Sequence, residues 1–379
     1  MTDQPITENR AQQARDYEAI HNRLFAARIG ITVVLLVWFL FSGASLDLAE
    51  GLRSRFPDQW WLVNAVYVLV TLFAYSAALF PLSFYSGHWL EHRYGLSNQS
   101  LSSWAGDYFK ELVLELVLTV AFLSVVYALL RAFPSTWWIW TTGVYIVLAV
   151  MLSAIWPVWI MPMFNTFEPL EDSELTQAVK AFAEQSGLTV LGVFKWGLEE
   201  KTETANAALA GLGRTRRIIL ADTMLDRYGK DEIIAVLAHE IGHFKNKDMM
   251  RMMMVGSLLA AIGFYMAHRV LLAASSALGF DGVADIAAFP VFMFALFLFS
   301  LFTMPLSNAY SRSREFAADE YAVRATGSAD PLVRALTKLA DQNLADVDPS
   351  PWIEWLLHSH PSIGRRVARA RALHEHIHA

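Results

Sequence analysis

Six long apolar runs constrain the fold of this chain more than any other feature. They cover residues 29–45, 61–85, 112–130, 137–160, 249–274 and 287–306. A helix needs about 20 apolar residues to cross a hydrocarbon core about 30 Å thick while it satisfies its own backbone hydrogen bonds. A soluble protein with six such runs would expose more apolar surface than its charged residues could keep in solution. The sequence therefore predicts a mainly α, multi-pass integral membrane protein with six spans.

Composition and aromatic positions agree with a membrane class. Of the 379 residues, 55% are hydrophobic and 17% are charged, against roughly 25% charged residues in soluble domains. Tryptophan gathers near the ends of the runs, as expected at a membrane interface: Trp60, Trp61, Trp137, Trp138, Trp140, Trp156 and Trp159. The net charge is -6 and the basic residues are dispersed, unlike the clustered charge of a nucleic-acid-binding protein. We therefore expect membrane lipids around the chain and no nucleic-acid partner.

The distribution of Lys and Arg predicts how the chain is oriented. The loops expected outside carry only Arg53, Arg55 and Arg131, and residues 271–311 contain neither Lys nor Arg. Because cytoplasmic loops are enriched in these residues, both termini and the long polar segment between the fourth and fifth runs are predicted to be cytoplasmic. Residues 1–28 lack the apolar core of a cleavable signal peptide, so the first span is expected to act as the insertion signal.

Three acids lie at or just inside the third run. Asp107, Glu111 and Glu115 follow one another at helical spacing. Ionisable groups at membrane depth are costly unless they face a partner or water. Two interpretations stay open: the acids line a wet cavity, or the helix begins later and the first two lie in the interface.

The polar segment between the fourth and fifth runs has the mixed polar and apolar composition of an ordinary globular domain. It predicts a helix over 173–185, strands near 190–196 and 216–220, and a helix that begins near Asp231. The last helix carries the sequence HEIGH at 239–243.

Residues four apart on a helix share one face, so His239 and His243 can bind one ion. Glu240 beside them can take a proton from a metal-bound water, whose pKa zinc lowers towards about 7. The chain has no cysteine, so His and carboxylates are the available metal ligands. The alternative is an exposed helix with an incidental His/Glu pair.

A catalytic zinc site needs three protein ligands and an open position. Glu315 and Asp319 lie four residues apart just after the sixth run, on the predicted cytoplasmic side. We expect Glu315 to complete the site with His239 and His243, so that each chain holds one Zn2+ ion. Asp319 can accept the free N–H of a ligating histidine and fix its tautomer. Taken alone, this second motif is also compatible with a plain acidic helix end.

From the first span onward the sequence resembles the type I CAAX prenyl protease family of integral membrane zinc metallopeptidases. The resemblance rests on the two metal motifs and on PLSFY at 81–85, EHRYGLS at 91–97, PVWIMPMFN at 157–165, RIILADT at 217–223 and His-Pro at 360–361. It implies a helical membrane barrel that encloses a water-filled chamber, capped by a zincin-like cytosolic domain with a small β-sheet. Family members cleave peptide bonds near the C-termini of substrates, typically prenylated CAAX proteins.

The resemblance also implies a division of the chain into five parts. They are a cytosolic N-terminal segment (1–28), membrane helices one to four (29–164), the catalytic insert (165–248), membrane helices five and six (249–306), and a C-terminal catalytic segment (307–379).

Further site residues follow only from the resemblance. Asn206, Ala207 and Gly211 match a segment that forms an edge strand and holds the substrate backbone, although an ordinary Ala/Gly-rich hairpin would look the same. His360 and Arg366 match residues placed to stabilise the oxyanion or to contact substrate. His360 could instead cap the helix that follows it.

We therefore expect a membrane zinc endopeptidase of the CAAX type, acting on a peptide or protein whose C-terminus can carry a lipid. The chain has six spans where eukaryotic members have seven, and its catalytic insert is shorter, which leaves the substrate open. One alternative is a quality-control metalloprotease of the heat-shock type. Another is a non-proteolytic scaffold or transporter with a structural metal site. Glu240 argues against the latter, because structural zinc is usually closed by a fourth protein ligand.

Overall fold

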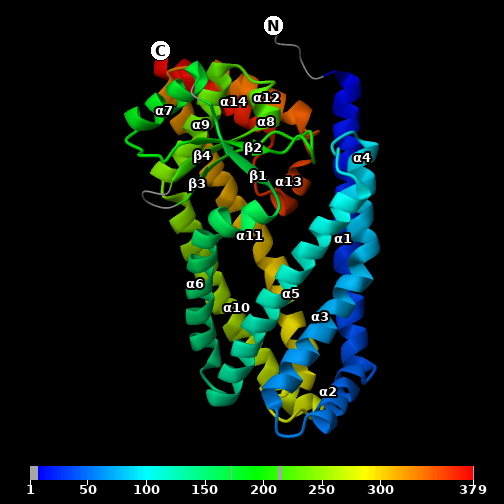
Figure 1. The fold of residues 1–379 in the computed structure, drawn as a ribbon. Helices are drawn as coiled ribbons and strands as arrows, with labels where there is room; N and C mark the ends of the chain where they lie inside the picture. Colours follow the sequence, from blue (N-terminus) through cyan, green and yellow to red (C-terminus); the bar gives the residue numbers. More distant parts are fainter. Residues whose placement is uncertain (1–6, 172, 212–215, 379) are drawn as a thin grey trace.

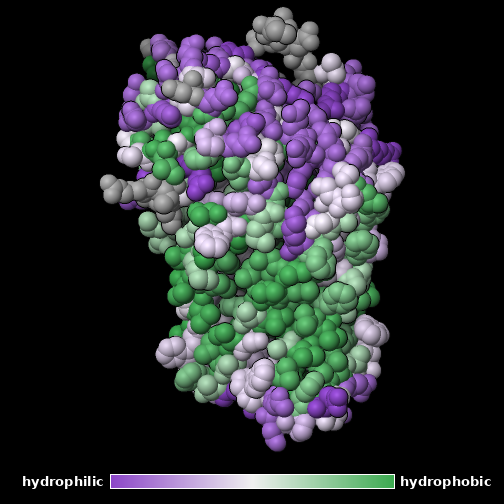
Figure 2. Space-filling model, in the orientation of Figure 1, coloured by the Kyte–Doolittle hydropathy of each residue, from purple (hydrophilic) through white to green (hydrophobic). Residues whose placement is uncertain are grey.

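The computed structural model of the protein describes residues 7–171, 173–211 and 216–378. Within these residues, six helices are long and apolar enough to span a membrane. They are α1 (Glu8–Phe41), α3 (Trp60–Phe84), α5 (Leu101–Ala132), α6 (Trp137–Ile155), α10 (Asp248–Leu278) and α11 (Phe289–Thr326) (Figure 1). Apolar residues form a broad belt over their middle parts, with polar surface beyond each end (Figure 2). The predicted mainly α fold with six spans is confirmed.

Short helical segments connect or prolong these spans. At one end of the bundle they are α2 (Ala44–Arg55) and η5 (Ile286–Ala288). At the other end α3 continues through the π-helical turn η1 (Tyr85–Leu90) into α4 (Glu91–Arg93). In the same way α6 continues through η2 (Trp156–Ile160) into η3 (Met161–Met163).

Two spanning helices begin well before their apolar runs, because a hydroxyl caps each start. The Thr7 hydroxyl accepts a hydrogen bond from the Arg10 amide at the start of α1, and the Ser100 hydroxyl accepts one from the Ser103 amide at the start of α5. The polar N-terminal segment is thus mostly helix, and α1 extends it out of the apolar belt to the polar end of the molecule (Figures 1 and 2).

The three acids of the third run all lie inside α5. Asp107 forms ion pairs with Lys110 and with Lys201 of the polar domain. Glu111 and Glu115 line two cavities between helices, of about 220 and 540 Å³. The acids therefore face a partner or a cavity, and α5 begins before all three, at Leu101.

The described residues also form one four-stranded sheet in the order β1-β2-β4-β3. Its strands are β1 (Thr166–Pro169), β2 (Val193–Gly197), β3 (Ala207–Ala210) and β4 (Arg217–Ala221). β2 and β4 are parallel, while β1 and β3 pair antiparallel at the two edges. The predicted strands correspond to β2 and β4. Local sequence did not predict the edge strands, since β1 ends at a proline and β3 consists of Ala and Leu, which have weak strand preference.

Helices pack around the sheet to complete the polar domain. They are α7 (Glu174–Gln185), α8 (Asp222–Leu225), α9 (Lys230–Lys245), α12 (Asp330–Gln342), α13 (Pro351–Leu357) and α14 (Ile363–His378). Ile218 and Leu220 of the central strand β4 join Val236 and Ile241 of α9 in one buried cluster. α9 is therefore held firmly against the sheet.

The polar domain, the start of α1 and the end of α14 lie at the same end of the molecule (Figure 1). α11 runs without a break from Phe289 to Thr326 and thus crosses the predicted boundary between 306 and 307. The sixth span and the second acidic motif therefore belong to one continuous helix.

Candidate metal centre and substrate cleft

A glycine allows the two motif-bearing helices to meet. Gly242 of α9 faces α11, and a Cβ added there would lie 3.0 Å from the Cα and the carbonyl oxygen of Ala318 and 3.1 Å from the Cβ of Tyr321. Only a residue without a side chain permits this approach. The close contact brings the histidines of α9 next to the acids of α11.

The structure brings the three predicted ligands together. His239 Nε2 and His243 Nε2 lie 3.1 Å apart. Glu315 Oε2 lies 3.5 Å from His239 Nε2, and Glu315 Oε1 lies 3.3 Å from His243 Nε2. These residues form a group that can hold a metal ion.

The separations fit a zinc ion. Two ligand atoms about 2.1 Å from a tetrahedral zinc lie about 3.4 Å from each other, which is close to the three separations found here. Burial lowers the pKa of His239, but its hydrogen bonds to Asp319 and Glu315 outweigh this effect and raise the pKa to about 9. The carboxylates thus create a negative potential that favours a cation at this point.

Each histidine has its own orienting carboxylate. Asp319 Oδ1 lies 2.9 Å from His239 Nδ1, as expected for Asp319. His243 Nδ1 lies 3.0 Å from Asp248 Oδ2, a contact that the sequence interpretation missed. Asp248 is buried at the start of α10. The signal available in the sequence was an aspartate five residues after His243, and the turn after α9 folds it back onto the ring.

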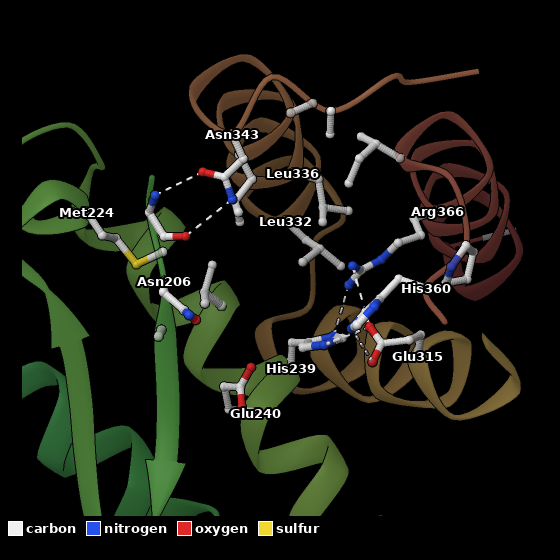
Figure 3. A pocket seen from close by; sticks show the side chains of 18 of the residues that line it. Asn206, Met224, His239, Glu240, Glu315, Leu332, Leu336, Asn343, His360 and Arg366 are labelled. Carbon is white, nitrogen blue, oxygen red and sulfur yellow. Dashed lines mark hydrogen bonds and ion pairs between the residues drawn. The ribbon is translucent and has the colours of Figure 1, made fainter. Parts of the chain in front are cut away.

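Arg366 lies with these groups rather than apart from them. Its Nε and Nη2 donate to Asp319 at 2.8 and 2.7 Å, and its Nη1 lies 3.5 Å from Glu315 Oε2. Arg366 was expected near the oxyanion or the substrate. The two bonds to Asp319 favour a different role, in which the buried guanidinium orients the two acids of α11. In Figure 3, Arg366 points toward His239 and Glu315.

Glu240 and His360 border the same cleft as the metal ligands. Burial raises the pKa of Glu240, while the neighbouring histidines act in the opposite direction. His360 Nε2 lies 3.4 Å from Glu315 Oε1, and its Nδ1 lies 3.0 Å from the Ser359 hydroxyl. Both side chains thus lie within reach of a molecule bound beside the metal ligands.

The cleft has a volume of about 600 Å³ and two unlike walls. One wall is the segment that leads into β3, where Ala205, Asn206 and Ala207 line the space, and another includes apolar side chains of α12 such as Leu336. In Figure 3, Asn206 and Glu240 lie across from His360 and Arg366. Gly211 follows the last residue of β3 with φ of +91°, beyond the residues that line the cleft.

A helical bundle with membrane-spanning helices and a cleft lined by three histidines and two carboxylates defines an integral membrane metallopeptidase. The profile of Peptidase family M48 matches residues 169–374, and a profile described as "CAAX prenyl protease N-terminal, five membrane helices" matches residues 2–166. The chain therefore belongs to Peptidase family M48, as a metalloendopeptidase of the CAAX prenyl protease 1 group. The second profile describes five membrane helices, whereas the described part of residues 2–166 contains four helices that could span a membrane.

Relatives and a solved structure agree with this assignment. The chain is 32% identical to CAAX prenyl protease 1 of Saccharomyces cerevisiae over 340 residues, which cover 83% of this chain and 75% of the relative. It is 29% identical to an Arabidopsis thaliana homolog (89% and 79% covered) and 28% identical to the uncharacterized metalloprotease YhfN of Bacillus subtilis (94% and 84% covered). The crystal structure of S. mikatae Ste24p has the same fold, with a TM-score of 0.83, 23% identity, and 96% and 89% of the two chains covered.

Proposed function

We propose that this membrane metalloendopeptidase uses one zinc ion held by His239, His243 and Glu315, with Glu240 as general base. The observation that carries the proposal is the close approach of the three side chains. The two imidazole Nε2 atoms lie 3.1 Å apart, and each lies 3.3 or 3.5 Å from one of the two carboxylate oxygens of Glu315. When bound, zinc polarises the scissile carbonyl and lowers the pKa of water towards about 7.

Glu240 removes a proton from the attacking water and then delivers it to the leaving amine. A carboxyl group can serve in both steps if its pKa is raised towards the operating pH, and burial raises the pKa of Glu240. His360 donates a hydrogen bond from Nε2 to the developing oxyanion, at the side of the cleft where Glu315 lies. Arg366 and Asp319 keep Glu315 and His239 in position.

The substrate is a polypeptide that pairs with the free edge of β3. A peptide added to a sheet edge is held through its main chain, and pockets along the edge select its side chains. The apolar wall of α12 favours aliphatic side chains in the cleft. CAAX prenyl protease 1 is the name of several relatives, and we propose the same substrate class here, a protein with a lipid-modified C-terminus. The cleft and both termini face the cytoplasm in this proposal.

The test uses the purified full-length protein in detergent with matched prenylated and unprenylated peptides. Glu240→Gln is expected to retain one zinc ion per chain and to lose cleavage, because the ligands remain and the base does not. Glu184→Gln on the exposed face of α7 is the matched control and should behave as wild type. Full hydrolysis by the Glu240→Gln variant would show that Glu240 is not the general base.

The two peptides test the substrate class separately. Equal cleavage of both peptides would show that the enzyme does not require a lipid on its substrate. Preferential cleavage of unfolded membrane proteins would favour the quality-control type of protease instead.

A further inference from the structure

A side chain from outside the sheet fixes the backbone just before β3. Asn343 follows the last residue of α12, and its Oδ1 accepts a hydrogen bond from the Ala205 amide at 2.9 Å. The Asn343 Nδ2 donates to the Ala205 carbonyl oxygen at 3.4 Å. Figure 3 draws both bonds. The side-chain amide thereby pairs with Ala205 on both sides, as a neighbouring strand would.

The adjacent carbonyl groups are also bound by side chains. Gln342 Nε2 donates to the Glu203 carbonyl oxygen at 2.7 Å, and the Thr223 hydroxyl donates to that of Thr204 at 2.8 Å. Three successive residues, 203–205, are thus held before the chain reaches Asn206. These bonds define where the edge strand begins.

Asn343 is itself held in place by the residue that follows it. Leu344 is buried and has φ of +52°, a left-handed conformation that is strained for a non-glycine residue and persists only where its surroundings impose it. It packs in one cluster with Ala14 of α1 and Leu96. Arg10 of α1 also donates to the Asp341 carbonyl oxygen at 2.8 Å. The polar half of α1 therefore supports the end of α12.

We infer that Asn343 is a positioning residue for substrate binding, which sets the height and register of the Asn206–Ala207 edge in the cleft. The inference rests on the proposed role of β3 as the strand that pairs with the substrate. Asn343 lines the cleft, but its two hydrogen-bonding groups are engaged by Ala205. It therefore acts on the substrate through the backbone of the edge strand.

The substitution Asn343→Ala is expected to change KM more than kcat. Main-chain pairing with β3 is made in the ground state and in the transition state alike, so its weakening raises KM more than it lowers kcat. We expect KM to rise about 10-fold, the size of two lost hydrogen bonds, and kcat to change less than about 3-fold. Zinc content should stay at the wild-type value, since the side chain of Asn343 bonds the backbone of Ala205 and not a metal ligand.

Peptides with a single ester bond in place of one amide test the pairing with β3 directly. If Asn343 only stabilised the fold, the difference in KM between ester and amide peptides would be the same in Asn343→Ala and wild type. In wild type, the ester that removes an N–H donor to β3 should be cleaved with a higher KM than the all-amide peptide. In Asn343→Ala this difference should shrink, because the pairing is already weakened. Gln185→Ala on the exposed end of α7 is the control and should keep the wild-type difference.

Hydrogen exchange of residues 203–207 gives a measurement that does not depend on cleavage. We expect these amides to exchange faster in Asn343→Ala than in wild type. If the Ala variant does not fold, the same measurement can be made on Asn343→Asp, which keeps the acceptor for the Ala205 amide but loses the Nδ2 donor. Wild-type exchange at these amides, an unchanged KM, or loss of zinc together with kcat would each overturn the inference. If wild type cleaved no peptide, the proposed function would fail, and the exchange data would still decide whether Asn343 holds the strand.

Discussion

The contact between α9 and α11 provides the sharpest test of how the fold builds the metal centre. Gly242→Ala would place a Cβ 3.0 Å from backbone atoms of Ala318, whereas ordinary contact begins at 3.4 Å. Backbone atoms cannot rotate away as a flexible side chain can, so the two helices must separate by about 0.4 Å. Ligand distances in metal sites tolerate deviations of about 0.2 Å. The substitution should therefore pull Glu315 away from His239 and His243.

The effect on metal binding should exceed the effect on stability. Ala in place of Gly favours a helix by about 1 kcal/mol, while overpacking costs about 1–3 kcal/mol, so the free energy of unfolding should fall by no more than about 2 kcal/mol. We expect zinc affinity to fall about 10- to 100-fold, as it does when groups that orient metal ligands are disturbed. Competition with a chromogenic chelator measures the affinity, and thermal unfolding of the metal-free protein measures stability.

Gly256→Ala is the matched control for this experiment. Gly256 lies inside α10, and a Cβ added there would meet nothing within 4 Å. This variant should bind zinc as wild type does and should be equally stable or slightly more stable. Wild-type zinc affinity and turnover in Gly242→Ala would refute the reasoning that the helix contact sets the ligand geometry.

Three further predictions concern the ligands and their orienting groups. His239→Ala should lose the bound metal itself, detected by elemental analysis, and chelator-treated wild type should lose cleavage and regain it with Zn2+; activity that survives complete removal of metal would contradict the metal centre. Asp319→Asn should weaken zinc affinity or turnover by about 10- to 100-fold without unfolding the helices, and unchanged titration and turnover would rule out a role for this carboxylate in orienting His239. Asp248→Asn should have a similar effect through His243. An effect as small as that of Asp226→Asn, a change at an exposed aspartate, would show that the contact does not orient the ring.

Properties that depend on a short stretch of sequence were predictable here. The apolar runs determine the six spans because a helix in lipid must satisfy its own backbone hydrogen bonds and present an apolar surface to the lipid, whatever else it packs against. The spacing of His239 and His243 determines that the two rings share one face of α9. The start of α7 was predictable for a similar reason, since Ser173 caps it locally and its hydroxyl accepts from the Thr176 amide.

Properties that depend on which distant residues meet were decided by the tertiary structure. Nothing in the local sequence assigns Asp319 to His239 and Asp248 to His243, because that assignment follows from the crossing of α9 over α11 at Gly242. The edge strand β3 exists because β4 offers it a partner, although its own residues have little preference for a strand. The link from Asn343 to Ala205 joins residues 138 positions apart in the chain. Such contacts depend on the packing of whole elements, which no local pattern of residues specifies.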